Sequence, residues 1–513
     1  MKWAARAVSA LPAGMKVWPR LSAPAISYLR VPVRPLRFGG HFFLSMHLVF
    51  LNQYYPLDAA PTGVMLEAVV RQLAEEGHEV TVLCASGGYA RAESKIESPD
   101  SRVPTEREIH SASSSQPSNI NHPLIHIVRI PATQFGRGSA IYKLIDYASF
   151  YLMVAWKLAT LRPDPDRVVA LTTPPFLSVL ARLISKFLGA DHALWVMDLY
   201  PDVMVAHGML PDGGWKHRVL ACIARWGFSG KRCATVLTLG PDMAERVSRV
   251  MGSGVSATVQ WVPLWGAEVI RDQSSVISGE RGGTSNIEGR QETERGIHSA
   301  SSSEPSTINH QPSTLNDQLS SALRAQRGWL ADELVVMYSG NMGLGHRFGE
   351  FLEAAKVHGQ SISHTRFVFY GGGKRRLEIE DFISQYPDCP IELHDYAPAQ
   401  DLSAHLQSAD VHLASLDAAW SGTMVPSKLQ GIFAVGRPVI FVGSSQSSIG
   451  RWVAESGGGW LVEPGDVSGL LVALNEAGDP GVRTARGNAA AEFAKSHFDK
   501  NTNATRVADI LTR

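Results

Sequence analysis

The chain has 513 residues, of which 44% are hydrophobic and 19% charged, a composition typical of a globular protein with two or three domains. Its 48 basic residues balance 48 acidic ones, which excludes a global field that would favour nucleic acid as a partner. The four cysteines are scattered and form no C-x-x-C pair, which excludes a disulfide framework or a zinc ribbon, and no metal site is expected.

Residues 1–45 are basic, and the first acidic residue of the chain is Asp58. Such a composition can mark a targeting peptide. The stretch lacks a clear apolar signal segment, however, and proline recurs through it, whereas Met46 begins a strand-like run. We therefore expect residues 1–45 to be a non-structural N-terminal extension.

From Met46 the sequence alternates β-rich runs with helical patterns. The expected strands are 47–52, 79–85, 125–130, 167–173, 193–198 and 234–240, and the expected helices are 62–77, 140–161, 176–190 and 216–228. Lys143, Asp146 and Lys157 interrupt the helix at 140–161, which is therefore expected to be amphipathic and not membrane-spanning. Strands separated by helices predict a mostly parallel sheet, so that 46–265 forms one Rossmann-like domain.

The same alternation restarts later in the chain. Strands expected at 333–340, 366–372, 391–396, 410–416, 438–443 and 458–464 predict a second Rossmann-like domain over 326–480, followed by C-terminal helices over 481–513. The segment 107–123 recurs with small changes at 295–312, and both copies are rich in Ser, Asn, Gln and Pro. We expect low-complexity insertions, one at about 92–122 and one within a linker at 266–325, in preference to a duplicated functional module.

Glycine-rich turns follow two of the strands expected in the second domain. Ligands of a doubly wound sheet bind beyond the carboxyl ends of its strands. The turn at 52–63 in the first domain has no G-x-G-x-x-G, and no cofactor is expected. In the second domain, Gly340, Gly343 and Gly345 would let backbone amides approach an anion, with His346 and Arg347 beside them. A further run, 371–373, precedes Lys374, although each loop alone could be a plain connection.

The stretch MVPSKLQGIFAVGRPVI, residues 424–440, supplies a third anion-friendly feature. Ser427 and Gln430 form an S-x-x-Q capping box, which predicts a helix that begins there and ends at Gly436. Lys428 falls in the first turn, where a basic charge is unfavourable beside the helix dipole unless an anion is present. The alternative is an ordinary surface lysine.

The ordered set of 52–63, WVMDLYPD, MYSGNMG, FVFYGGG and VPSKLQGIFAVGRPVI resembles glycosyltransferase family 4 of the GT-B glycosyltransferases. It is most similar to the O-antigen and capsule branch that includes the L-fucosamine transferases. The resemblance covers about 46–500, apart from the insertions. It implies two Rossmann-like domains facing across a cleft, with a nucleotide-sugar held by the second domain and the acceptor by the first. It also implies retaining, metal-independent transfer.

Several residues depart from the family pattern. The two glutamates that most members carry match Thr423 and Gly431. The second of these glutamates usually binds the ribose hydroxyls, so the resemblance assigns no residue to the ribose. The usual Arg and Lys after the first strand of the second domain match Asn341 and His346, so that Lys428 and Lys374 remain to neutralise a leaving diphosphate.

The resemblance also assigns candidate roles. Asp198 matches the position of a histidine in many relatives, where it would orient or deprotonate the acceptor hydroxyl, unless it is only a turn residue. Asp198 and Lys428 are the candidate catalytic residues. The candidate donor-binding residues are Thr62, Gly63, Gly340, Asn341, Gly343, His346, Arg347, Gly372, Lys374, Tyr396, Thr423, Pro426, Ser427 and Gly431.

The predicted function is transfer of a sugar from a nucleotide-sugar, with UDP expected as the nucleotide, to a lipid-linked or polysaccharide acceptor in cell-surface glycan synthesis. The alternatives are a nucleotide-sugar epimerase of the same shape and a non-catalytic nucleotide-sugar-binding protein. The segment 214–232 combines tryptophans with Lys and Arg, which is compatible with peripheral contact with the inner membrane surface from the cytoplasm, or with an ordinary solvated helix face. The DPD at 164–166 precedes a strand and is read as a turn.

Overall fold

A computed structural model describes residues 45–56, 61–86, 122–133, 135, 140–253, 255, 257–266, 314–359, 364–398 and 402–513, together with the strands β1 (Leu36–Phe38) and β2 (His41–Phe43). The chain divides into two compact units, 1–45 and 46–513. In the first unit β1 and β2 pair antiparallel, and the remainder of the expected N-terminal extension lies outside the described residues apart from Ser45. The insertion expected at about 92–122 and most of the linker expected at 266–325 also lie outside them.

The N-terminal half of the second unit is built on a seven-stranded parallel sheet with the order β5-β4-β3-β6-β7-β8-β9. Its elements are β3 (His47–Leu51), α1 (Pro61–Glu75), β4 (Glu79–Ala85), β5 (Ile125–Ile130), α4 (Ala140–Thr160), β6 (Arg167–Ala170), α5 (Leu177–Leu188), β7 (Asp191–Trp195), α6 (Asp202–Ala206), α7 (Trp215–Gly227), β8 (Cys233–Thr238), α8 (Pro241–Met251) and β9 (Thr258–Trp261). The helix α8 and the strand β9 were not among the expected elements.

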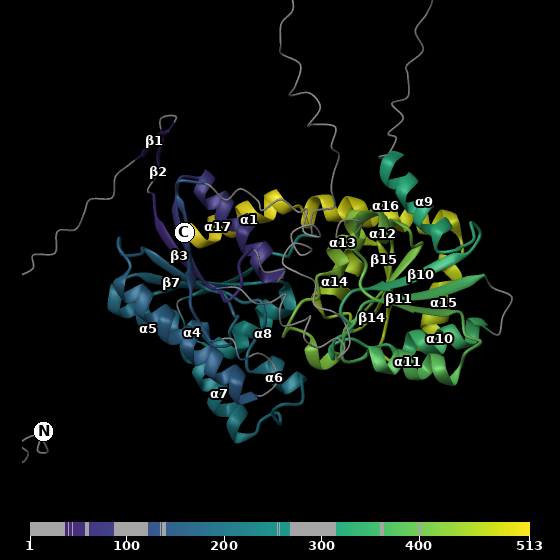
Figure 1. The fold of residues 1–513 in the computed structure, drawn as a ribbon, viewed down its shortest axis with the longest axis horizontal. Coiled ribbons are helices and arrows are strands. Elements are labelled where there is room, and N and C mark those ends of the chain that lie inside the picture. Colours follow the sequence, from purple (N-terminus) through teal and green to yellow (C-terminus); the bar gives the residue numbers. More distant parts are fainter. Residues whose placement is uncertain are drawn as a thin grey trace, which may run out of the picture. The chain divides into compact units, whose positions relative to one another are not determined.

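The C-terminal half is built on a six-stranded parallel sheet with the order β12-β11-β10-β13-β14-β15 (Figure 1). Its elements are α9 (Thr314–Gln326), β10 (Leu334–Ser339), α10 (Gly349–Gly359), β11 (Thr365–Tyr370), α11 (Arg376–Gln385), β12 (Ile391–His394), α12 (Leu402–Gln407), β13 (Val411–Ser415), the 3₁₀ helix η3 (Ala418–Trp420), α13 (Lys428–Ala434), β14 (Val439–Val442), α14 (Ser448–Ser456), β15 (Gly459–Val462), α15 (Val467–Ala477), α16 (Pro480–His497) and α17 (Lys500–Thr512). The helix α9 occupies the end of the stretch expected to be a linker.

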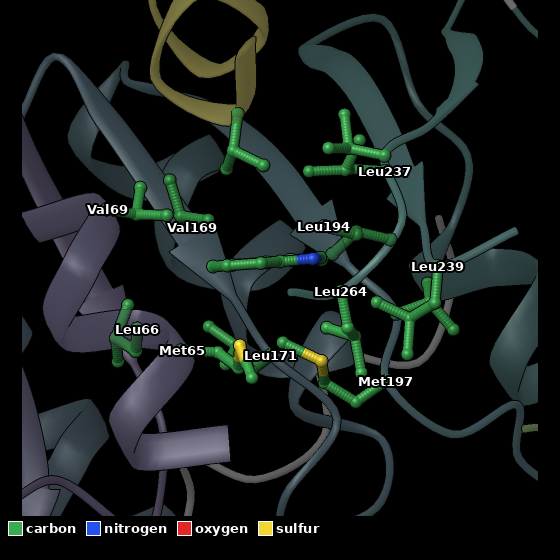
Figure 2. Close-up of a cluster of buried hydrophobic side chains, with 14 of the residues drawn as sticks. Met65, Leu66, Val69, Val169, Leu171, Leu194, Met197, Leu237, Leu239 and Leu264 are labelled. Carbon is green, nitrogen blue, oxygen red and sulfur yellow. The ribbon is translucent and has the colours of Figure 1, made fainter. Parts of the chain in front are cut away.

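The central strands are buried along their whole length because helices cover both faces of each sheet. All five residues of β3 and all five of β13 are buried. Figure 2 shows Val69 of α1 beside Val169 of β6, in a buried cluster that also contains Leu66 of α1 and Leu194 of β7. The two parallel Rossmann-like sheets predicted from the alternating pattern are therefore confirmed.

The C-terminal helices connect the two halves. The helix α16 packs against α13, whereas α17 packs against α1 and β8 of the N-terminal half. Arg167, which begins β6, donates a hydrogen bond to the carbonyl of Leu511, and the Asn503 side-chain amide donates to the carbonyl of Pro263 at 3.3 Å. The chain thus returns to the first sheet after completing the second.

No helix within the described part of the chain is both long enough and apolar enough to cross a membrane.

Candidate donor and acceptor site

The strand order of the C-terminal sheet reverses between β10 and β13, and the ends of these strands hold the glycine-rich turns. Gly340 follows β10 with φ at 129°, a conformation that favours glycine. A Cβ atom at Gly340 would lie 2.7 Å from Cε of Lys428, and one at Gly371 would lie 2.1 Å from the carbonyl oxygen of Gly340. The turn at Gly371 therefore packs against the turn at Gly340, and the turn at Gly340 packs against Lys428. A larger residue than glycine would not fit at either position.

The helix α13 begins at Lys428, as the sequence predicted, but the capping box is wrong. Ser427 is exposed and its side chain makes no capping hydrogen bond. Gln430 is fully buried, and its amide has no hydrogen-bond partner among the described residues. Gly436 follows the helix in the left-handed conformation, with φ at 69°. Tertiary burial of Gln430 has displaced the local contact that the spacing suggested.

Lys428 points from α13 to the turn after β10. Its Nζ donates to the carbonyl of Asn341 at 3.2 Å and lies 3.0 Å from Nε2 of His346 and 5.0 Å from the ring centroid of Tyr338. The other ring nitrogen of His346, Nδ1, lies 2.8 Å from the carbonyl oxygen of Ser415. Since a carbonyl can only accept, Nδ1 carries the proton and Nε2 accepts from the ammonium. His346 is thus a neutral acceptor that positions the lysine.

The environment of this pair disfavours positive charge. Burial lowers the pKa of Lys428 from 10.5 to about 7. Burial and then the neighbouring Lys428 charge lower the pKa of His346 to about 3. No carboxylate within the described residues forms a salt bridge with Lys428. A bound anion would supply the missing counter-charge and restore the ordinary protonation of the amine.

Arg347 follows His346 but is directed to carboxylates. Its guanidinium contacts Glu350 at 2.5 Å and Asp417 at 3.2 Å. The same Glu350 oxygen accepts from the N–H of Gly465 at 2.9 Å. The structure therefore places Arg347 in an ion-pair network that joins α10 to the loops around it.

The second glycine turn carries two further candidates. The N–H of Met342 donates to the carbonyl of Gly372 at 2.7 Å, and the hydroxyl of Tyr396 donates to the same carbonyl at 3.1 Å. Lys374 is exposed, and its charge, after burial, helps to lower the pKa of His207 in the N-terminal half. Lys374 therefore faces the region where residues of the two halves approach each other.

The remaining C-terminal candidates differ in accessibility. Thr423 is fully buried, and its hydroxyl donates to the carbonyl of Trp420 at 2.8 Å. Pro426 is buried, whereas Gly431 is half-buried inside α13. A Cβ atom at Gly431 would meet only Leu406 Cδ1, at 3.5 Å, so this position has room for a side chain.

In the N-terminal half Asp198 lies in the turn after β7, beside the end of β6. The hydroxyl oxygen of Thr172 accepts from the N–H groups of Met197 and Asp198, at 3.1 and 3.0 Å. No described residue donates to the Asp198 carboxylate, and burial raises its pKa from 3.8 to about 6. Such a carboxylate can accept a proton near neutral pH.

The turn after β7 also contacts the C-terminal half. The N–H of Leu199 donates to the carbonyl of Thr423 at 2.8 Å, one residue from Asp198. On the neighbouring helix α8, the carboxylate of Asp242 accepts from the N–H of Gly422 at 2.9 Å. The candidate acceptor loop and the loop that leads into Lys428 are therefore hydrogen-bonded directly. Thr62 and Gly63 lie in the first turn of α1, where a Cβ atom at Gly63 would lie 3.2 Å from Cα of Tyr55.

Comparison with known proteins assigns both halves. The family described as "Glycosyl transferase 4-like domain" matches residues 62–265, and the family described as "Glycosyl transferases group 1" matches residues 333–477. The chain carries two glycosyltransferase domains and is a glycosyltransferase.

Known relatives agree with this identification. The glycosyltransferase is 24% identical over 437 residues to the "Putative colanic acid biosynthesis glycosyl transferase WcaI" of Escherichia coli strain K12, covering 84% of this chain and 91% of that protein. It also resembles the crystal structure of WaaG, a glycosyltransferase involved in lipopolysaccharide biosynthesis, with a TM-score of 0.55, 14% identity and coverage of 91% and 100% of the two chains. A second similar structure is that of Anabaena Alr3699/HepE in complex with UDP. Its TM-score is 0.56 at 12% sequence identity, and the match covers 91% of this chain and 100% of that chain. These structures show that the fold is GT-B.

Sequence reasoning did not identify what holds Lys428 in the glycosyltransferase. It grouped His346 with the donor-binding residues but not with the lysine, and it did not single out Tyr338 or Ser415. These residues come from different turns and strands, 82 positions separating His346 from Lys428, and no local pattern relates them. Within the described ranges, no group of three or more His, Cys, Asp or Glu side chains is placed to hold a metal ion.

Proposed function

We propose that this glycosyltransferase transfers a sugar from a nucleotide-sugar to an acceptor hydroxyl, with the donor diphosphate bound against Lys428. The arrangement of Lys428 supports this proposal most directly. Lys428 is half-buried, and its side chain lies against the glycine turn at Gly340. Its ammonium is held by His346 and the Asn341 carbonyl and has no carboxylate partner in the described structure. Removing a cation from water without a counter-charge is unfavourable, so the site is suited to an anionic ligand.

The proposed reaction places charge where Lys428 can meet it. A bond forms between the acceptor oxygen and the sugar, and the bond between the sugar and the diphosphate breaks. Negative charge then grows on the leaving diphosphate, beside the lysine and the glycine turn at Gly340. Lys428 supplies a full positive charge at this place, whereas the N-terminus of a helix such as α13 supplies about half of one.

Asp198 is the proposed partner of the acceptor. Its ionised carboxylate would accept a hydrogen bond from the attacking hydroxyl and assist the loss of its proton. The hydrogen bond between Leu199 and Thr423 supports a position of Asp198 near the donor-binding half. Its pKa of about 6 leaves it mostly ionised at neutral pH.

We further propose the finer properties that the resemblance implies: retention of configuration, UDP as the nucleotide, and a lipid-linked or polysaccharide acceptor of the O-antigen or capsule type, with the L-fucosamine transferases as the nearest branch. A UDP complex of one solved relative and the colanic acid and lipopolysaccharide roles of two others support the nucleotide and the class of glycan. A lipid-linked acceptor would bring the enzyme to the cytoplasmic face of the membrane as a peripheral protein.

A donor panel tests the proposal. The purified protein is incubated with UDP-, GDP- and TDP-sugars and with lipid-linked acceptors, and release of nucleoside diphosphate is measured together with the anomeric configuration of the product. We expect acceptor-dependent release from one donor class. Tight donor binding without release would favour the non-catalytic alternative, and isomerised donor without transfer would favour the epimerase. A thermal-shift screen of free nucleotides identifies the base beforehand, because a ligand that binds only the folded state raises Tm.

A further inference from the structure

Three helices of the N-terminal half carry more than half of the large exposed apolar side chains of the described structure. Of 21 large apolar side chains that are exposed there, 12 lie on α4, α5 and α7: Ile141, Tyr142, Leu144, Ile145, Leu152, Trp156, Leu183, Phe187, Trp215, Val219, Ile223 and Trp226. Phe187 is 82% exposed, Trp215 73% and Leu152 72%. Single exposed apolar residues are ordinary, but a contiguous group marks a surface that contacts something.

The three helices form one surface, the α4–α5–α7 face. The helix α5 packs against both α4 and α7, and the three run beside one another in the lower left of Figure 1. The helix α4 is apolar on two sides, since Val154 and Leu158 are buried while Ile145, Leu152 and Trp156 are exposed. The amphipathic pattern expected for this helix therefore accounts for only one of its faces. The second apolar face has no partner within the described residues.

The charge of this face is nearly all positive. Its basic residues are Lys143, Lys157, Arg182, Lys186, Lys216, Arg218 and Arg225, and Lys231 and Arg232 follow α7 directly. The one acidic residue on the three helices is Asp146, whose carboxylate accepts from the N–H of Phe135 at 3.1 Å. The guanidinium of Arg182 on α5 lies 4.1 Å from the ring centroid of Trp226 on α7, so a cationic and an aromatic side chain are in contact on this face.

We propose that the α4–α5–α7 face docks on an anionic lipid bilayer. Exposed Trp, Phe and Leu side chains interleaved with Lys and Arg match the boundary between acyl chains and anionic headgroups. A protein partner of ordinary composition would leave this density of like charges poorly matched, whereas a bilayer offers negative charge along the whole face. The long stems of Lys and Arg allow their charges to reach the headgroups while the apolar residues insert.

The inner side of the same helices borders the proposed acceptor site. The Tyr151 hydroxyl on α4 donates to the carbonyl of Pro175, and Phe176, next in the chain, packs its ring 6.2 Å from that of Tyr200. Tyr200 is two residues from Asp198. A lipid-linked acceptor lying in the bilayer would thus approach Asp198 from the docked side. This orientation rests on the proposed function, whereas docking itself does not.

Vesicle co-sedimentation of the full chain tests the proposal. Wild-type protein is mixed with vesicles of phosphatidylcholine alone or with phosphatidylglycerol at three to one, at low and high salt. We expect binding to the anionic vesicles that weakens with salt. Leu152→Glu with Trp156→Glu should lower the partition coefficient at least about tenfold, and Lys216→Gln with Arg218→Gln about tenfold or more, given roughly fivefold for each basic residue near an anionic leaflet.

Matched controls use exposed apolar residues of the C-terminal half. Leu377 on α11 is 65% exposed and Val472 on α15 is 59% exposed, and replacing both with Glu should leave vesicle binding unchanged. Each variant is checked by thermal unfolding. The proposal is overturned if the wild-type protein stays in solution with anionic vesicles at low salt, or if the controls lose binding equally. It is also overturned if sedimentation shows wild-type oligomers that the α4 variant dissociates while vesicle binding persists. Donor turnover on a soluble acceptor, measured in parallel, shows separately whether the transfer reaction stands.

Discussion

Replacing Lys428 by Met should stabilise the protein and impair its reaction. The folded environment lowers the pKa of the amine from 10.5 to about 7, so folding at neutral pH works against the charged form. Because the side chain is only half-buried, we expect a gain of about 1–3 kcal/mol in the free energy of unfolding at pH 7. The unfolded state binds the extra proton between pH 7 and 10.5, so the gain is fully present below pH 7 and disappears as pH rises toward 10.5.

The same substitution should lower donor turnover ten- to hundredfold. An ammonium about 4 Å from a phosphate is worth about 4 kcal/mol at an effective dielectric constant of 20, of which a hydrogen bond between charged groups retains about 1.5–3 kcal/mol. With a pKa near 7, Lys428 should also give wild-type kcat/KM a limb that falls above neutral pH, and the variant should lack this limb.

Urea unfolding and nucleoside diphosphate release measure the two effects of Lys428→Met on one preparation. Normal turnover would show that Lys428 is an ordinary surface cation. Reduced stability together with reduced turnover would show that the lysine supports the fold and not the donor. Only opposite changes in the two quantities agree with a lysine whose charge the fold disfavours and the donor diphosphate requires.

Three further predictions concern the residues around the site. Gly340→Ala should reduce donor turnover about tenfold and lower Tm, because the φ of Gly340 is 129° and the new Cβ would displace Lys428. Gly343→Ala is the control, since its Cβ would meet only Asn341, at 3.4 Å and beyond, and it should change turnover and Tm little. Equal effects of the two substitutions would refute this prediction. Asp198→Asn should remove the rise of kcat/KM with pH near 6. It should also raise the free energy of unfolding at pH 7 by about 1–2 kcal/mol, because burial disfavours the carboxylate that is ionised at this pH. If the variant kept the rise of kcat/KM near pH 6, that rise would belong to another group. Gly431→Ala should raise stability by about 0.5–1 kcal/mol in thermal unfolding, because the position is helical and has room for a methyl group, and a lower Tm would show a close contact there.

Thr423 and Gly431, the two positions that the resemblance matches to family glutamates, have different surroundings. Thr423 is buried and bonded to Trp420, and its carbonyl accepts from Leu199, so the position serves contact between the halves. Gly431 is half-buried with space beside it. Donor binding is therefore proposed to depend on Lys428 and the glycine turns, with no carboxylate at either of these positions.

The proposed site combines groups whose charges the fold disfavours. Both the Lys428 ammonium and the Asp198 carboxylate have pKa values moved toward neutrality by burial. Such groups reduce stability and are retained where a ligand compensates for them.

The sequence by itself determined the architecture. Short apolar runs such as 48–51, bounded by turn residues, indicate strands buried on both faces, and their alternation with helical patterns predicts parallel sheets. The main strands and the two-sheet plan therefore followed from local patterns, whereas α8, β9 and α9 did not. The sequence also determined that glycine turns end β10 and β11 and that a helix begins at Lys428, because these depend on neighbours in the chain.

Only the tertiary structure decided which of these parts meet. Lys428 meets His346, and Arg347 meets Asp417, only because the fold brings together residues far apart in the chain. Gln430 is likewise buried by such contacts and does not cap its helix. The second, exposed apolar face of α4 was likewise apparent only in the structure, where the other face is buried in the core. A helical pattern shows which residues are apolar but not which side of the helix the core will bury.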